Sequence, residues 1–332
     1  MPAVKLHDTT IVWSLHGAMR DVLGELLSMF EPPPSELAAE VPPPAVRFEL
    51  RPAPESAARD PREEGWQPSF FHGAVEAFHG PLGFLIWDHA SRVLVPSGGA
   101  PLEASIAPAE REVTPGSTAT ALQIALILAM RSVGLFHLHA AAVVLPSGLP
   151  VLVVGGSGAG KTTTTLALLE AGARYLGDDS LYLASGHDGL RLVAFPRLFH
   201  VGAATLAAFP RLAPLTTDSP PPTERRLFDP RRAYPGRFVS STVMGEGSLA
   251  LFPSIAGGET SIAAIHRAEA FGRLLGSSGA LVVEGVPGRE ENLRALRTLL
   301  GIVSCYDLRL GADVLRNPVL AITKLAEVFD ER

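Results

Sequence analysis

The stretch Gly155-Gly-Ser-Gly-Ala-Gly-Lys-Thr162 decides how this sequence is interpreted, because it matches the pattern G-x-x-x-x-G-K-[ST]. Glycines let successive backbone N–H groups turn toward one anion, and a helix that follows adds the positive end of its dipole. In this pattern Lys161 reaches the β- and γ-phosphates of a nucleotide, and the Thr162 hydroxyl is a ligand of Mg²⁺. The sequence therefore predicts ATP and Mg²⁺ as cofactors. The residues predicted to hold them are Gly155, Gly156, Ser157, Gly158, Ala159, Gly160, Lys161, Thr162 and Thr163.

The sequence on both sides of this loop has the pattern that a phosphate site requires. The apolar runs 140–145 and 151–154 predict two strands joined by a turn, and the second strand leads directly into Gly155. Residues 162–171 then predict a helix that Gly172 ends. With three lysines in the whole chain, a chance match to the pattern is expected in roughly a few chains per thousand.

Two adjacent carboxylates, Asp178 and Asp179, follow a short predicted strand at 175–176. Neighbouring side chains on an extended segment point to opposite sides, so one carboxylate can face a metal ion while the other faces an acceptor hydroxyl. Such a division suits phosphoryl transfer, which needs a metal ligand and a base. The alternative interpretation is a solvated turn or a pair of helix-capping residues.

Two histidines, His137 and His139, precede the loop at the start of the strand pair. On a strand both imidazoles face the same side, which brings His139 toward the γ-phosphate or the acceptor. The alternative is a pair of hydrogen-bonded histidines at a strand edge. A zinc site is disfavoured, because no third ligand lies nearby in the sequence.

A proline- and arginine-rich segment, 216–237, is predicted to be a long polar loop. Its arginines can place positive charge over a transferring phosphoryl group or bind an acidic peptide; the alternative is a solvated basic loop. Arg197 follows a predicted strand and is a further candidate. The arginines proposed to contact substrate or phosphate are Arg197, Arg225, Arg226, Arg231 and Arg232.

Composition limits the remaining function classes. The net charge is 28 − 34 = −6, which argues against a general nucleic-acid binder, and 47 % hydrophobic residues argue against a disordered chain. The single Cys305 cannot form an internal disulfide. No secretory signal or membrane-spanning run is recognised, so a cytoplasmic protein without a membrane span is expected.

The chain is predicted to contain two domains, a small α+β accessory or substrate-recognition domain at 1–112 and the catalytic domain at 113–332. In the first domain we expect a helix over 14–30 with Ser14 as its N-cap. A strand is predicted at 46–50 and a hairpin at 84–95. The second domain is expected to be α/β.

Together, the segment 139–143, the loop 155–162 and the segment 171–179 resemble the C-terminal catalytic domain of the HPr kinase/phosphorylase family. The resemblance covers about 45 residues, 137–182, and implies a mixed sheet with flanking helices, related to ATP-dependent phosphoenolpyruvate carboxykinase. It implies that Asp178 is the catalytic base, that Asp179 and Thr162 are Mg²⁺ ligands, and that His139 and Lys161 belong to the active site. The stretch 193–200 lacks the acidic residue of the family signature.

The resemblance leads to a functional prediction. The chain is expected to be an ATP-dependent kinase that transfers the γ-phosphate to a serine-type hydroxyl of a small protein or peptide, as divergent members of this group do with ribosomally made peptides. A homo-oligomer is possible. Two alternatives stay open: a small-metabolite kinase or carboxykinase-like enzyme, and a non-catalytic nucleotide-dependent binding or scaffold protein.

Overall fold

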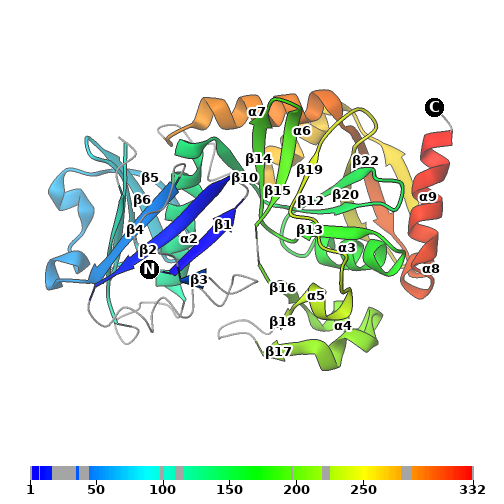
Figure 1. Cartoon of the computed structure of the whole chain (residues 1–332), viewed down its shortest axis with the longest axis horizontal. Coiled ribbons are helices and arrows are strands. Elements are labelled where there is room, and N and C mark those ends of the chain that lie inside the picture. The colour runs from blue at the N-terminus through cyan, green and yellow to red at the C-terminus, as the bar shows by residue number, and fades with distance from the viewer. Residues whose placement is uncertain are drawn as a thin grey trace. The chain divides into compact units, whose positions relative to one another are not determined.

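The computed structural model divides into two compact units (Figure 1). The structure describes residues 2–6, 8–16, 35–36, 45–97, 101–108, 116–195, 197–218, 225–277 and 286–330. The first unit comprises residues 1–136 and 279–293, and the second comprises residues 137–278 and 294–332. By its contacts helix α2 (Ser117–Met130) belongs to the first unit, whereas the predicted boundary at 112/113 assigns it to the second domain.

A mixed sheet forms the first unit. In the described part of this unit it has nine strands, in the order β3-β1-β2-β4-β9-β8-β7-β6-β5. Strand β4 pairs in parallel with both β2 and β9. From β9 through β8, β7 and β6 to β5, each strand is antiparallel to the next. Their bounds are β1 Pro2–Leu6, β2 Thr9–Leu15, β3 Ser35–Glu36, β4 Ala45–Pro52, β5 Gln67–His72, β6 Val75–Gly80, β7 Gly83–Trp87, β8 Arg92–Pro96 and β9 Leu102–Ile106; two 3₁₀ turns lie at Glu55–Ala58 and Pro61–Glu64.

The sequence predictions for this unit have mixed outcomes. The strand at 46–50 is confirmed as β4, and the hairpin at 84–95 is confirmed as β7 and β8. The helix predicted over 14–30 is wrong at its start, because Ser14 lies in strand β2 and is paired with Glu49 of β4. Residues 17–30 of that prediction lie outside the described residues.

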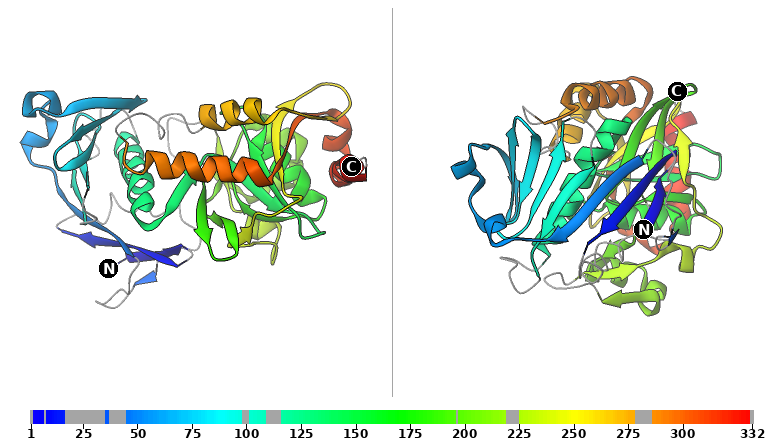
Figure 2. Two further views of the ribbon diagram at one scale, coloured as in Figure 1. Left: turned by 90° about the horizontal axis from the view of Figure 1, so that it is seen from above. Right: turned by 60° about the vertical axis from the view of Figure 1, so that its left-hand side comes forward.

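Helix α2 packs against β7, β8 and β9 and covers the sheet of the first unit (Figure 2). Its first turn is fixed by Asp88, which is fully buried in the β7–β8 turn. The Asp88 carboxylate accepts hydrogen bonds from Ser117 Oγ at 3.2 Å and from Thr118 Oγ1 at 2.7 Å. It also accepts from the backbone N–H of Ala90 and Ser91. A carboxylate at a helix N-terminus is favoured by the helix dipole, so Asp88 joins the hairpin to the helix.

The second unit is built on a mixed sheet with the order β13-β11-β12-β20-β22-β21 over its described strands. The pairs β12–β20 and β20–β22 are parallel, whereas β11 is antiparallel to both of its neighbours. Helix α3 packs on β11 and β12, and α9 packs on α3. The bounds are β11 Ala140–Val144, β12 Pro150–Val154, α3 Lys161–Glu170, β13 Arg174–Gly177, β20 Leu249–Ile255, β21 Ser261–Ala264, α6 Arg267–Ser277, β22 Ser304–Leu310, α8 Ala312–Arg316 and α9 Val319–Asp330. Strand β10 (Leu135–Leu138) and helix α7 (Arg289–Ile302) each contain residues of both units. The α/β class is thereby confirmed.

A smaller sheet and a compact extension complete the second unit. The strands β14 (Leu181–Gly186), β15 (Gly189–Ala194) and β19 (Ser241–Val243) pair antiparallel. The extension contains the three-stranded sheet β16-β18-β17. Its elements are β16 Phe199–Val201, α4 Ala203–Ala208, a 3₁₀ helix at Pro210–Leu215, β17 Thr216–Asp218, β18 Arg226–Phe228 and α5 Pro230–Ala233.

The extension corrects the prediction of a long polar loop over 216–237. Strands β17 and β18 and helix α5 occupy much of that segment. Local composition predicts a loop there, because prolines and arginines are poor strand formers. The strands nevertheless form because Phe228 is buried against Phe199 of β16, a contact that spans about thirty residues of sequence.

No helix of the described residues is long and apolar enough to cross a membrane.

Candidate phosphate-binding active site

The predicted phosphate loop lies between strand β12 and helix α3, as its pattern requires. Gly158 and Gly160 have positive φ angles of 80° and 101°, a backbone region that side chains with a Cβ atom rarely adopt. A Cβ atom on Gly160 would lie 2.7 Å from Cδ1 of Ile255, and one on Gly155 would lie 2.8 Å from Cβ of Ala159. Glycine is therefore favoured at these places, and the loop ends at a helix N-terminus, where anions are favoured.

Lys161 is buried and has four partners at the start of α3. Its ammonium group donates to the carbonyl oxygens of Gly155 at 2.8 Å and Gly156 at 3.2 Å. It also lies 3.1 Å from Oδ1 of Asp179 and 3.1 Å from Nε2 of His139. Because an ammonium group can only donate hydrogen bonds, Nε2 of His139 is the acceptor and its ring proton is on Nδ1.

The two aspartates occupy a tight turn after β13, not a continued strand. Asp179 has a φ of 60°, and the N–H of Ser180 donates to the carbonyl oxygen of Asp178 at 2.8 Å. A positive φ at a residue other than glycine is strained, and such residues cluster at functional sites. The extended geometry expected from the sequence is therefore wrong, and both carboxylates contact the start of α3.

The two carboxylates of this turn differ in environment. Asp178 is buried, and Thr162 Oγ1 donates to its Oδ2 at 2.6 Å, whereas its Oδ1 has no hydrogen-bond partner among the described residues. Burial, with the charge of Asp179 second, raises the pKa of Asp178 to about 7. Burial by itself would raise the pKa of Asp179, but the attraction of the positive Lys161 and the hydrogen bond from its ammonium group outweigh burial, so the pKa of Asp179 is lowered. One carboxylate is thus readily protonated while its neighbour stays ionised.

The two histidines have separate places. His139 lies 3.9 Å from Oδ1 of Asp179, and burial, followed by the positive charge of Lys161, lowers its pKa, so the imidazole is neutral at pH 7. His137 is buried, and its Nε2 lies 2.9 Å from Oγ of Ser180. His139 therefore belongs to the cluster around Lys161, whereas His137 supports the turn that carries the aspartates.

The predicted arginines separate into two groups. Arg197 is half-buried, its Nε has no hydrogen-bond partner in the described part of the chain, and it interacts electrostatically with both Asp179 and Asp178. Arg225 donates to Oγ of Ser157 in the loop at 2.9 Å. The other three arginines have different surroundings. Arg226 forms an ion pair with Asp218, Arg231 lies over the ring of Phe238, and Arg232 is exposed on α5. Thr163 Oγ1 lies 2.9 Å from Oγ1 of Thr205 on α4, which joins the loop helix to the extension.

The sequence interpretation missed His200. Phe199 and Val201 of β16 are buried, so the strand alternation turns His200 to the opposite face. There it interacts electrostatically with Arg197, Asp179 and Arg225, and burial, followed by the charge of Arg197, lowers its pKa to about 4. Its strand is only three residues long and is formed by long-range pairing, so no local pattern marked it.

Comparisons with known proteins do not assign a family or a function to this site. No protein-family model and no curated protein sequence matches the chain. Among solved structures it is similar to the Hpr(Ser) kinase/phosphatase from Coxiella burnetii, with 14 % sequence identity and a TM-score of 0.32. The similarity covers 59 % of this chain and 91 % of that chain. A TM-score this low carries no argument about function, so the interpretation depends on the residues themselves.

Proposed function

We propose that this protein is an ATP-dependent kinase that transfers the γ-phosphate to a serine-type hydroxyl of a small protein or peptide. One observation carries the proposal: Asp178 contacts Thr162, and Asp179 and His139 both contact Lys161. Lys161 and Thr162 are the first two residues of α3, directly after a glycine-rich loop. Binding of a nucleotide alone needs the loop and its lysine. The paired carboxylates favour a reaction at the bound phosphate.

In this proposal the loop takes the β- and γ-phosphates. The ammonium group of Lys161 now donates to the carbonyls of Gly155 and Gly156, and it exchanges them for phosphate oxygens when a nucleotide binds. Arg225 already contacts the loop at Ser157, and Arg197 supplies a second positive charge. These cations stabilise the charge that gathers on the transferring phosphoryl group.

The donor set fits a magnesium ion bound with the nucleotide. Thr162 offers a hydroxyl oxygen and Asp179 an ionised carboxylate, which are the hard oxygen ligands that Mg²⁺ takes together with water and substrate phosphates. The described ranges contain no group of three or more His, Cys, Asp or Glu side chains that could hold a metal ion. In this proposal the nucleotide phosphates therefore supply further ligands. When bound, the ion would neutralise charge on the phosphate oxygens.

Asp178 is the proposed base. Thr162 holds one carboxylate oxygen, and the other is buried without a hydrogen-bond partner among the described residues, so in this proposal the binding of the acceptor brings a hydroxyl to that unused oxygen. The acceptor oxygen bonds to the γ-phosphorus, and the bond between that phosphorus and the bridging oxygen breaks. The hydroxyl proton passes to Asp178, and ADP leaves.

The test is transfer of labelled γ-phosphate from ATP with Mg²⁺, using as acceptors peptides encoded beside the gene and free serine. Asp178→Asn should lower transfer about 10²- to 10⁴-fold with nucleotide affinity retained. Asp188→Asn, at an exposed carboxylate of the β14–β15 turn, is the matched control and should leave transfer unchanged. Tight ATP binding without transfer or hydrolysis, unaffected by Asp178→Asn, would refute the kinase and favour a nucleotide-dependent binding protein.

A further inference from the structure

The extension of the second unit carries positive charge that the rest of the chain lacks. Strands β16, β17 and β18 and helices α4 and α5 make up this part of the unit (Figure 1). Residues 197–238, the extension with the residues that flank it, contain seven arginines and three acidic residues, a net charge of 7 − 3 = +4. Since the whole chain has a net charge of −6, all other residues together have −6 − 4 = −10. The extension is therefore a basic segment of an acidic protein.

Part of this charge fastens the extension to helix α3. Arg211 forms an ion pair with Glu170 of α3. Arg237 donates to the carbonyl oxygen of Leu169, also of α3, at 2.7 Å. When Glu170 is counted with the extension, the net charge is still 4 − 1 = +3. The excess of positive charge thus exceeds what the attachment to α3 neutralises.

Two other arginines of the extension lie where a ligand in water can meet them. Nε of Arg226 lies 3.5 Å from Oδ1 of Asp218, whose side chain is 95 % exposed. An ion pair so exposed to water contributes little free energy, so Arg226 can exchange this partner for another carboxylate. Arg232 is exposed on α5. Both guanidinium groups can form paired hydrogen bonds with a carboxylate.

The basic extension borders the phosphate site at two points. Arg225 donates to Oγ of Ser157 in the glycine-rich loop at 2.9 Å. Arg197 interacts electrostatically with Asp178, the proposed base. An acceptor whose hydroxyl reaches Asp178 therefore passes close to the extension, and the residues beside that hydroxyl lie within reach of its positive field.

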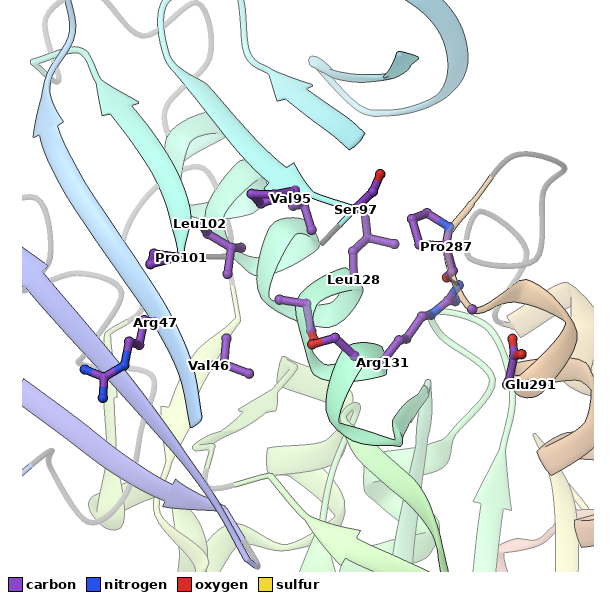
Figure 3. A pocket seen from close by; sticks show the side chains of 14 residues that line it. Val46, Arg47, Val95, Ser97, Pro101, Leu102, Leu128, Arg131, Pro287 and Glu291 are labelled. Carbon is purple, nitrogen blue, oxygen red and sulfur yellow. Dashed lines mark hydrogen bonds between the residues drawn. The ribbon is translucent and has the colours of Figure 1, made fainter. Parts of the chain in front are cut away.

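A cavity of about 570 Å³ in the first unit is a different feature (Figure 3). Its lining includes both signs of charge, from Arg47, Arg131 and Glu291. Every lining residue belongs to the first unit, so the cavity shares no residue with the phosphate loop or the extension. The charge of the extension lies on the unit that holds the loop, where an acceptor has to bind.

From this arrangement we infer that the extension binds an acidic segment of the peptide acceptor, with aspartate or glutamate side chains beside the accepting serine. This inference rests on the proposed kinase function for the reaction, and on charge for the recognition. A single-stranded nucleic acid is the other polyanion to consider, and it is usually held by bases stacked on aromatic side chains. No exposed large hydrophobic side chain of the described residues lies between 197 and 238, which favours the peptide.

The first test is binding, measured by fluorescence anisotropy of the full chain with two labelled peptides. One is Asp-Asp-Asp-Ser-Asp-Asp-Asp, and the other has asparagine at every aspartate position. At low salt the aspartate peptide should bind at least about tenfold more tightly. At about 1 M salt, where the Debye length is about 3 Å, the difference should fall below about twofold.

Matched variants assign this binding to the extension. Arg226→Gln/Arg232→Gln should weaken binding of the aspartate peptide by about threefold or more. Arg294→Gln/Arg297→Gln, at two exposed arginines of α7, removes the same charge and should leave the affinity unchanged. If the first double variant does not fold, Arg232→Gln alone should weaken binding about twofold, because its side chain is exposed.

The inference is wrong if the two peptides bind alike, or if the α7 variant weakens binding as much as the extension variant. It is also wrong if a single-stranded oligothymidine of equal charge binds more tightly than the aspartate peptide. Transfer of labelled γ-phosphate to both peptides then separates this inference from the kinase. Equal transfer to both peptides would leave the kinase in place and overturn the acidic preference, whereas tight binding of the aspartate peptide without transfer would support the docking surface and contradict the kinase.

Discussion

Substitution of the loop glycines by alanine separates backbone strain from steric conflict. Gly160 has a φ of 101°, and an alanine there would also meet Ile255. Gly158 has a φ of 80° with no atom within 4 Å of an added Cβ, and Gly156 has neither a positive φ nor a close neighbour. A left-handed residue with a Cβ atom costs about 1–2 kcal/mol. At an unstrained position, alanine instead stabilises by about 0.4–1 kcal/mol, because it restricts the unfolded chain.

The expected order of stability follows from these contributions. Gly156→Ala should be neutral or stabilising, Gly158→Ala should lose about 1–2 kcal/mol, and Gly160→Ala should lose more than Gly158→Ala. The residue that opposes Gly160, Ile255, is half exposed, so its flexible side chain can move partly away. The double variant Gly160→Ala/Ile255→Ala should therefore regain the steric part of the loss and keep the strain.

The assay is urea unfolding followed by circular dichroism, together with titration of a non-hydrolysable ATP analogue. The loop conformation described above is refuted if Gly156→Ala destabilises as much as Gly160→Ala. It is also refuted if Ile255→Ala recovers the whole loss, because the positive φ would then cost nothing.

Three further predictions concern other parts of the chain. Asp88→Ala should lower the free energy of unfolding by about 2 kcal/mol or more in urea, because it leaves buried donors without their acceptor. A loss below about 0.5 kcal/mol would contradict the conclusion that Asp88 joins the hairpin to α2. Tyr234→Phe should lower the free energy of unfolding by about 1.5–3 kcal/mol in the same assay, because the tyrosine hydroxyl donates to the charged Glu170 at 2.6 Å. An unchanged unfolding midpoint would show that this hydrogen bond does not stabilise the fold. His200 should titrate near pH 4 by NMR. Since its unfolded pKa is about 6.5, it binds fewer protons when folded, so stability should fall as the pH falls from about 6.5 to 4; His200→Gln should flatten that slope.

Much of the second unit was predictable because its signals are local. The strands β11 and β12 are continuous apolar runs, as expected for strands buried on both faces, and the glycine loop follows directly. The first unit was harder to predict. Its strands β2, β4 and β9 pair in parallel across intervals of thirty or more residues, and such pairing leaves no local turn signal.

The sequence by itself determined the prediction of a phosphate loop and its place between a strand and a helix, since a glycine pattern, a lysine and a threonine lie within one short segment. It also identified Asp178, Asp179 and His139 as residues of interest. Only the tertiary structure decided how they meet. A left-handed turn at Asp179 brings both carboxylates to the start of α3, and the extension brings Arg197 and His200 to the same place. The physical reason is that a turn conformation and a three-residue strand depend on packing against distant segments, which local propensity does not encode.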